Sequence, residues 1–120
     1  INAIEVSATG GPEFMGMFTA IDDQSKEAYL EDLAKNLRPQ IDCPLILVGG
    51  VRSYDVDDRI TSENTADFIS MARPLISEPD LINQWKAGTK KDTRCISCAK
   101  CLMTVLQGGE VRCYEFEPDG

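Results

Sequence analysis

Four cysteines near the end of the sequence have the types and spacing of metal ligands. Cys95, Cys98, Cys101 and Cys113 follow the pattern C-x2-C-x2-C-x11-C, and Cys43 stands apart from them. Thiolates at such short spacing can converge on one iron–sulfur cluster or one zinc ion. An odd, clustered set of cysteines fits a disulfide scaffold poorly. Three interpretations stay open: a cluster, a zinc site, or four reduced thiols that bind no metal.

A glycine pair and an arginine form a second candidate site. Gly49 and Gly50 directly follow one apolar run, and Arg73 ends the next. Glycine N–H groups can approach an anion closely, a following helix N-terminus favours negative charge, and arginine adds a charge-assisted hydrogen bond. The pattern predicts a phosphate-binding cup between neighbouring strands, with Arg52 as a further candidate contact. The alternative is a tight turn at the glycines, with Arg73 paired to a surface carboxylate.

Composition argues against several classes of function. The sequence has no histidine, so the commonest general base is missing and no nucleophile–base pair can be assembled. The 20 acidic and 12 basic residues give a net charge of −8, which argues against a nucleic-acid partner. No apolar run approaches the roughly 18 residues of a membrane span, and no basic leader is visible. We therefore expect no membrane partner and a cytoplasmic location.

Alternating apolar runs and amphipathic stretches must position these residues. The runs predict strands at residues 3–7, 44–48 and 67–71, of which the second is expected to be buried on both faces. Helical spacing predicts helices at residues 25–38, 53–60 and 78–88, the last with Leu81, Ile82 and Trp85 facing inward. Asp22 and Asp23 are expected to cap the first helix. The alternation indicates βαβ units and a parallel sheet.

The loops at the carboxyl ends of the strands are where a ligand of such a sheet binds. They are expected at residues 7–16, 49–53 and 72–77. Met15, Met17 and Phe18 could line an apolar pocket there, but the simpler interpretation is that they cover the open end of the sheet. Residues 90–120, which contain the four clustered cysteines and are called the cysteine segment below, show only weak strand character, near residues 111–114. Three strands cannot close a barrel of about 250 residues. Because the sequence opens within an expected strand and without Met, we expect a piece of a longer protein or a processed product.

The order of three motifs resembles a known family. Leu45–Ser53, Ala66–Ile76 and Glu78–Leu81 are together similar to the old yellow enzyme family, and most closely to its NADH:flavin oxidoreductase branch related to 2,4-dienoyl-CoA reductase. Cys95–Leu102 resembles the cysteine segment that follows the barrel in that branch. The resemblance implies an α/β fold class: the C-terminal half of a TIM (β/α)₈ barrel, strands six to eight with their helices, followed by a cysteine-rich tail. Residues 1–89 would form the partial barrel and residues 90–120 the tail.

The resemblance also implies a cofactor and a reaction. The family holds FMN at the barrel mouth and binds its phosphate at positions that correspond here to Gly49, Gly50, Ala72 and Arg73, although the family's usual glycine is replaced by Ala72. It transfers a hydride from NAD(P)H to FMN and then to a small-molecule alkene. The family's substrate-binding pair and proton-donating tyrosine lie upstream, so the chain by itself is expected to be inactive.

Two other interpretations compete with the oxidoreductase. One is a four-cysteine module that holds a 4Fe-4S cluster or zinc for electron transfer or stability. The cluster-bearing reductases of the family use C-x2-C-x3-C-x11-C, and the second gap is one residue shorter here. The other is an inert fragment or interaction piece. Half a barrel exposes sheet edges and an apolar interior, so we expect it to self-associate.

Overall fold

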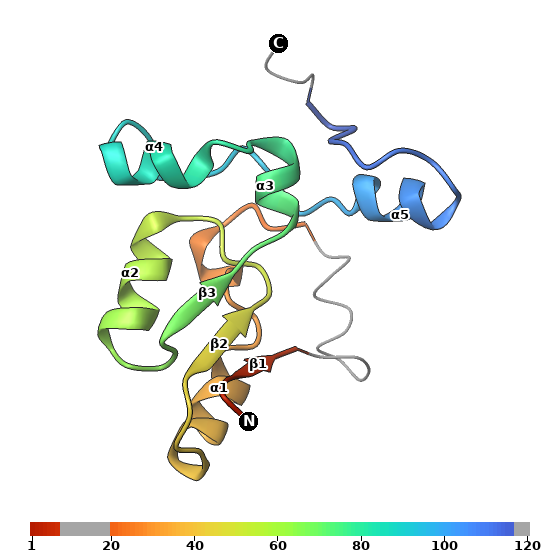
Figure 1. The fold of residues 1–120 in the computed structure, drawn as a ribbon. Helices are drawn as coiled ribbons and strands as arrows, with labels where there is room; N and C mark the ends of the chain where they lie inside the picture. Colours follow the sequence, from red (N-terminus) through yellow and green to blue (C-terminus); the bar gives the residue numbers. More distant parts are fainter. Residues whose placement is uncertain (8–19, 117–120) are drawn as a thin grey trace.

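Three short parallel strands form the centre of the chain in a computed structural model, which describes residues 1–7 and 20–116 (Figure 1). They are β1 (Ile4–Val6), β2 (Leu45–Val48) and β3 (Phe68–Ser70). The sheet order β1-β2-β3 repeats the order in the chain, and both pairs are parallel. The three strands predicted from the apolar runs are therefore confirmed, each slightly shorter than expected.

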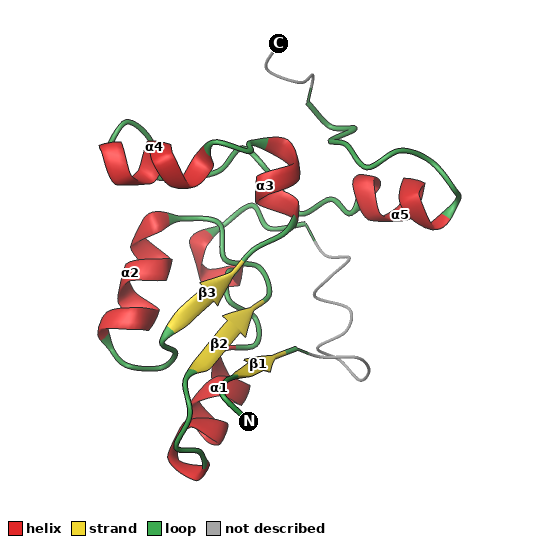
Figure 2. Cartoon of the chain, in the orientation of Figure 1, coloured by secondary structure: helices red, strands yellow, loops and turns green. Residues whose placement is uncertain are grey.

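Short helices connect and follow these strands (Figure 2). In chain order they are η2 (Gln24–Lys26), α1 (Glu31–Leu37), η3 (Arg38–Gln40), α2 (Tyr54–Ser62), α3 (Arg73–Ser77), α4 (Leu81–Ala87) and α5 (Lys100–Leu106). Figure 1 shows α3 and α5 beyond the arrowheads of β2 and β3. Among the described residues, no helix combines the length and apolar character that crossing a membrane requires.

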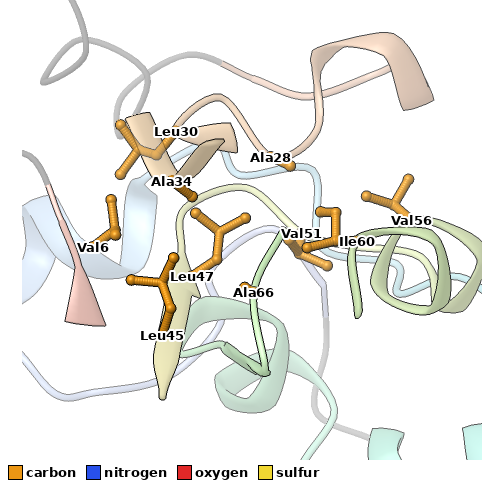
Figure 3. Packing of buried hydrophobic residues seen from close by; sticks show 10 residues of the cluster. All are labelled: Val6, Ala28, Leu30, Ala34, Leu45, Leu47, Val51, Val56, Ile60 and Ala66. Carbon is orange, nitrogen blue, oxygen red and sulfur yellow. The ribbon is translucent and has the colours of Figure 1, made fainter. Parts of the chain in front are cut away.

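The core lies between one face of the sheet and helices α1 and α2. Leu45 and Leu47 of β2 are fully buried and pack in one cluster with Ala34 of α1 and Ile60 of α2 (Figure 3). Ser53 caps α2 as expected, because its hydroxyl accepts a hydrogen bond from the N–H of Val56 at 3.4 Å. These contacts fix α2 against the sheet directly after the glycine pair.

The opposite face of the sheet is only partly covered. Parallel register places Ile46 beside Phe68 and Val48 beside Ser70. Ile46 and Val48 are half-buried, and the Phe68 side chain is 59% exposed. The expectation that the second strand is buried on both faces is therefore wrong, because α1 and α2 pack on the Leu45 and Leu47 face.

The single helix expected over residues 25–38 is also wrong. Asp23 does cap a first turn, accepting from the N–H of Ser25 at 2.8 Å, but that turn ends at Lys26. Ala28 then adopts a left-handed conformation with φ of 52°, which no helix interior allows. The chain therefore turns before α1 begins at Glu31.

The chain after β3 contains more helix than the sequence indicated. α3 follows β3 directly, with Pro74 in its first turn, where a missing N–H costs nothing. Helix α5 occupies the cysteine segment, and residues 111–116 contain no strand. In α4, Leu81 and Trp85 are buried as predicted, whereas Ile82 is 37% exposed.

Candidate functional site

A cavity of about 380 Å³ opens at the carboxyl ends of all three strands. It is lined by residues at the end of each strand or directly after it, namely Ser7, Val48, Gly49, Gly50, Val51, Ser70, Met71, Ala72, Arg73 and Pro74. The walls come from Tyr29, Leu30 and Ile76 and from the cysteine segment, through Ser97, Cys101, Leu102, Val105 and Val111. Residues 8–16 of the first expected loop, and with them Met15, Met17 and Phe18, lie outside the described residues.

The four residues predicted to bind a phosphate line this one cavity. Gly49 and Gly50 follow β2, and Ala72 and Arg73 follow β3. Because β2 and β3 are hydrogen-bonded neighbours, the two loops lie side by side at the same edge of the sheet. The fold therefore places the backbone of Gly49 and Gly50 and the charged residue Arg73 at one cavity.

Glycine is required at Gly49 and Gly50 for two separate reasons. Both have positive φ, 118° and 76°, a region that residues with a side chain rarely adopt. A Cβ on Gly50 would also lie 2.8 Å from Cδ1 of Tyr29 and 2.9 Å from Cδ1 of Ile21. Tyr29 therefore packs directly on the glycine pair and lines the cavity beside it.

Ala72 is compatible with its position after β3. Its φ is −122°, so the backbone there needs no glycine. Arg73 is half-buried and begins α3. Its side chain borders the large cavity and also a smaller one lined by the cysteine segment.

The N-terminus of α2 is not open to a ligand, contrary to the sequence prediction. One carboxylate oxygen of Glu27, Oε2, accepts from the N–H of Arg52 at 2.8 Å and from the N–H of Ser53 at 3.0 Å. The N–H of Tyr54 donates to the carbonyl of Lys91 at 2.7 Å. The N–H groups of Ser53 and Tyr54 at this helix end are therefore bound by the protein itself.

Arg52 does not line the cavity and instead connects two distant segments of the chain. It is 9% exposed, and its guanidinium donates to the carbonyl of Ile21 and, at 3.4 Å, to that of Thr93. The N–H of Thr93 returns a hydrogen bond to the carbonyl of Arg52 at 2.9 Å. This pairing holds the start of the cysteine segment against the loop after β2.

The four clustered cysteines line one small cavity of about 20 Å³. Burial raises the pKa of the Cys95 thiol. Burial acts in the same direction on Cys113, but hydrogen bonds from the backbones of Phe116 and Glu115 outweigh it and lower the pKa of that thiol. Within residues 1–7 and 20–116, no three His, Cys, Asp or Glu side chains are grouped closely enough to hold a metal ion. The thiols share a cavity, but their arrangement does not fit a metal site.

The cysteine segment is anchored beside α3 by contacts that the sequence did not indicate. Glu78 is 5% exposed, and its Oε2 accepts from the N–H of Arg94 at 2.7 Å and from the hydroxyl of Thr93. The Arg94 guanidinium donates to the carbonyl of Ser77 at 2.8 Å. This anchor explains how Leu102 and Val105 come to wall the large cavity.

Sequence reasoning also missed Glu27 and Tyr29. Both fall inside the helix expected over residues 25–38, and both contact the loop after β2, which is 20 or more residues away along the chain. No local pattern could have indicated such contacts. The left-handed turn at Ala28 orients the Glu27 and Tyr29 side chains toward that loop, and the sequence around Ala28 does not predict this conformation.

Comparison with known proteins gives one consistent result. Residues 16–92 match the sequence family described as NADH:flavin oxidoreductase / NADH oxidase. The chain is 33% identical over 83 residues to a 4,4'-dithiodibutanoate disulfide reductase of Rhodococcus erythropolis, covering 69% of this chain and 20% of the relative. It is 34% identical over 84 residues to an NADH oxidase of Thermoanaerobacter brockii (68% of this chain, 13% of the relative).

A third relative extends the similarity into the cysteine segment. This metal reductase of Desulforamulus reducens is 30% identical over 115 residues, which is 94% of this chain and 17% of the relative. The chain therefore spans a fifth or less of the length of these curated relatives.

Proposed function

The chain belongs to the NADH:flavin oxidoreductase / NADH oxidase family, and on that premise we propose that it forms the C-terminal part of the FMN barrel of a larger oxidoreductase. Residues 1–89 would be the partial barrel and residues 90–120 the cysteine-rich segment. The observation that carries the proposal is the single cavity in which Gly49, Gly50, Ala72 and Arg73 meet. In the parent protein this cavity would hold the FMN phosphate.

The residues present fit a flavin phosphate. Gly49 and Gly50 line the cavity and have no side chain, so their backbone N–H groups can approach an anion there closely. Arg73 can donate charge-assisted hydrogen bonds to phosphate oxygens. Tyr29, Leu102 and Val105 give the same cavity apolar walls that exclude water. FMN, when bound, would supply the hydride transfer, and these residues would bind and orient it.

A second part of the proposal concerns the hydride donor and the hydride acceptor of the reaction. We propose NAD(P)H as donor and an activated alkene as acceptor in the parent protein. The relatives are named for a disulfide, for NADH oxidation and for metal reduction. An assay of the parent protein should therefore offer an enone, a disulfide, oxygen and a metal ion in parallel.

Flavin binding by the full-length parent protein tests the proposal. The protein should purify with a flavin absorption spectrum, and Arg73→Ala should weaken FMN binding roughly 10- to 100-fold through loss of a charge-assisted contact. Lys86→Ala is the matched control, because Lys86 is an exposed basic residue of α4 and does not line the cavity. A parent protein that binds no flavin, or an Arg73 variant that binds it normally, would contradict the assignment.

The four cysteines carry the second candidate function, a metal module for electron transfer or stability. What favours it is that all four line one small cavity. Their arrangement in the described part of the chain does not form a metal site, so no step is assigned to a metal. Iron, sulfide and zinc content of the parent protein, purified anaerobically, decides the question. A stoichiometric metal would establish the module, and metal-free protein would rule it out.

A further inference from the structure

We infer that Glu27 is a positioning residue for the loop that binds the flavin phosphate. Its carboxylate fills the N-terminus of α2 and thereby holds residues 49–53 in the shape that turns the glycine pair toward the cavity. The inference rests on the proposed function and assigns a role to a residue that lies outside the cavity lining.

Three hydrogen bonds from the loop converge on one oxygen of Glu27. Oε2 accepts from the N–H of Arg52 at 2.8 Å, from the N–H of Ser53 at 3.0 Å and from the hydroxyl of Ser53 at 3.2 Å. Arg52 and Ser53 are 9% and 1% exposed, so their N–H groups depend on an acceptor that the protein supplies. A negative acceptor for buried N–H groups gives strong hydrogen bonds, and their loss leaves those groups unsatisfied.

The backbone next to Glu27 is strained in a way that serves this contact. Ala28 is 4% exposed and has a φ of 52°, a conformation that non-glycine residues adopt only when their surroundings impose it. On one side of Ala28, Glu27 binds the loop backbone. On the other side, the Tyr29 ring packs against Gly49 and Gly50. The loop is thus braced from two nearby residues at once.

The carboxylate also decides where an anion can bind. Helix α2 has nine residues, and its N-terminal dipole would otherwise attract a phosphate. With the charge of Glu27 already at that end, a second anion is repelled. The phosphate would therefore bind at the glycine pair and Arg73, which line the cavity.

The affinities of the full-length parent protein for FMN and for riboflavin test this role, because riboflavin lacks only the phosphate. Glu27→Gln keeps the size of the side chain and removes its charge. We expect the Kd for FMN to rise roughly tenfold and the Kd for riboflavin to change less than about twofold. Glu27→Asp keeps the charge with a shorter reach, and we expect a smaller loss that is again specific to FMN. Glu63→Gln is the matched control, since it removes an acid from the exposed end of α2.

The outcomes separate this role from general stability and from the proposed function. If Glu27→Gln weakens FMN and riboflavin equally, or neither, Glu27 does not position the phosphate loop, whereas flavin binding by the wild type still supports the proposed function. If Glu27→Gln does not fold, Glu27→Asp alone decides, and an unchanged ratio of the two affinities overturns the inference. A wild-type protein that binds neither flavin overturns the proposed function and this inference with it.

Discussion

At the scale of single residues, the candidate site depends on glycine, the residue without a side chain, at position 50. Gly50 has positive φ and the Tyr29 ring against it, so conformation and space both demand glycine. Gly88, which ends α4 with a φ of 71°, shares the conformation, but a Cβ added there would have no atom within 4 Å. Substitution of Gly88 therefore tests the effect of backbone strain alone, whereas substitution of Gly50 adds a steric clash.

We expect Gly50→Ala to abolish FMN binding by the parent protein and to lower its melting temperature, because the methyl group must displace Tyr29 or Ile21. Gly88→Ala should cost only the left-handed strain, about 1–2 kcal/mol, and leave FMN affinity unchanged. Thermal unfolding and flavin titration of both variants measure the difference. Equal effects of the two substitutions on FMN would show that Tyr29 does not confine the loop.

The sequence revealed the residues of the site better than the residues that support them. Gly49, Gly50 and Arg73 could be singled out because glycines after an apolar run and an arginine after the next have a recognisable pattern. Glu27 and Tyr29 could not, since their contacts depend on the left-handed turn at Ala28. That turn is stabilised by residues 50–53, and local propensity cannot report on so distant a partner.

At the scale of elements, charged pairs join helices and strands. Arg59 of α2 donates to the carboxylate of Glu31 in α1 at 2.7 Å and 3.0 Å. Hydrogen bonding to Arg59, with help from Lys35, lowers the pKa of Glu31 from 4.5 to about 2. Arg38 binds Asp67 beside β3 in a similar way and, with the N–H of Leu45, lowers the pKa of Asp67 to about 2.

We expect acid to loosen the contact between α1 and α2. A carboxyl group whose pKa is lower in the folded state contributes stability above its unfolded pKa, and the contribution is lost as the pH falls toward the folded pKa. For Glu31 this window runs from about pH 4.5 down to about pH 2. Hydrogen-exchange protection of residues 31–37 in the parent protein, corrected for intrinsic rates, should fall across it.

Glu31→Gln provides the control for this pH dependence. Without the carboxyl group, protection of α1 should already be lower at about pH 6 and should fall less across the acid window. The remaining decrease should reflect Asp67, whose pair with Arg38 is intact in this variant. A variant with the same acid dependence as the wild type would show that Glu31 contributes nothing to it.

The elements that the sequence predicted correctly are those with a strong apolar signal. The strands and α2 follow directly from their hydrophobic runs and from the Ser53 cap. Helix α3 has five residues, too few for a periodic pattern. The order of the cysteine segment comes from Glu78 and Arg94, whose contacts with it are tertiary.

At the scale of the whole molecule, the sheet is unfinished. Among the described residues, β1 and β3 each pair only with β2, so each leaves one edge without a partner strand. Phe68 is 59% exposed on the face that α1 and α2 leave uncovered. A closed barrel would supply both missing neighbours and an interior for Phe68.

We expect the isolated 120-residue chain to self-associate through this face and these edges. Sedimentation velocity should show species larger than the 13.2 kDa monomer, and Phe68→Ser should reduce their proportion. Met103→Ser is the matched control, since Met103 is an exposed apolar residue of α5. A clean monomer over the micromolar range would contradict the expectation.

The walls of the cavity come from residues as far apart as Ser7 and Val111. During protein synthesis the strands emerge in the order in which they pair, so each can dock on its predecessor as soon as it leaves the ribosome. The cavity gains its last wall only when the cysteine segment follows, several seconds after the glycine pair at typical rates of translation. Cofactor loading would then be one of the last events in the maturation of this part of the protein, and a nascent chain would pass through a stage that is folded but still empty.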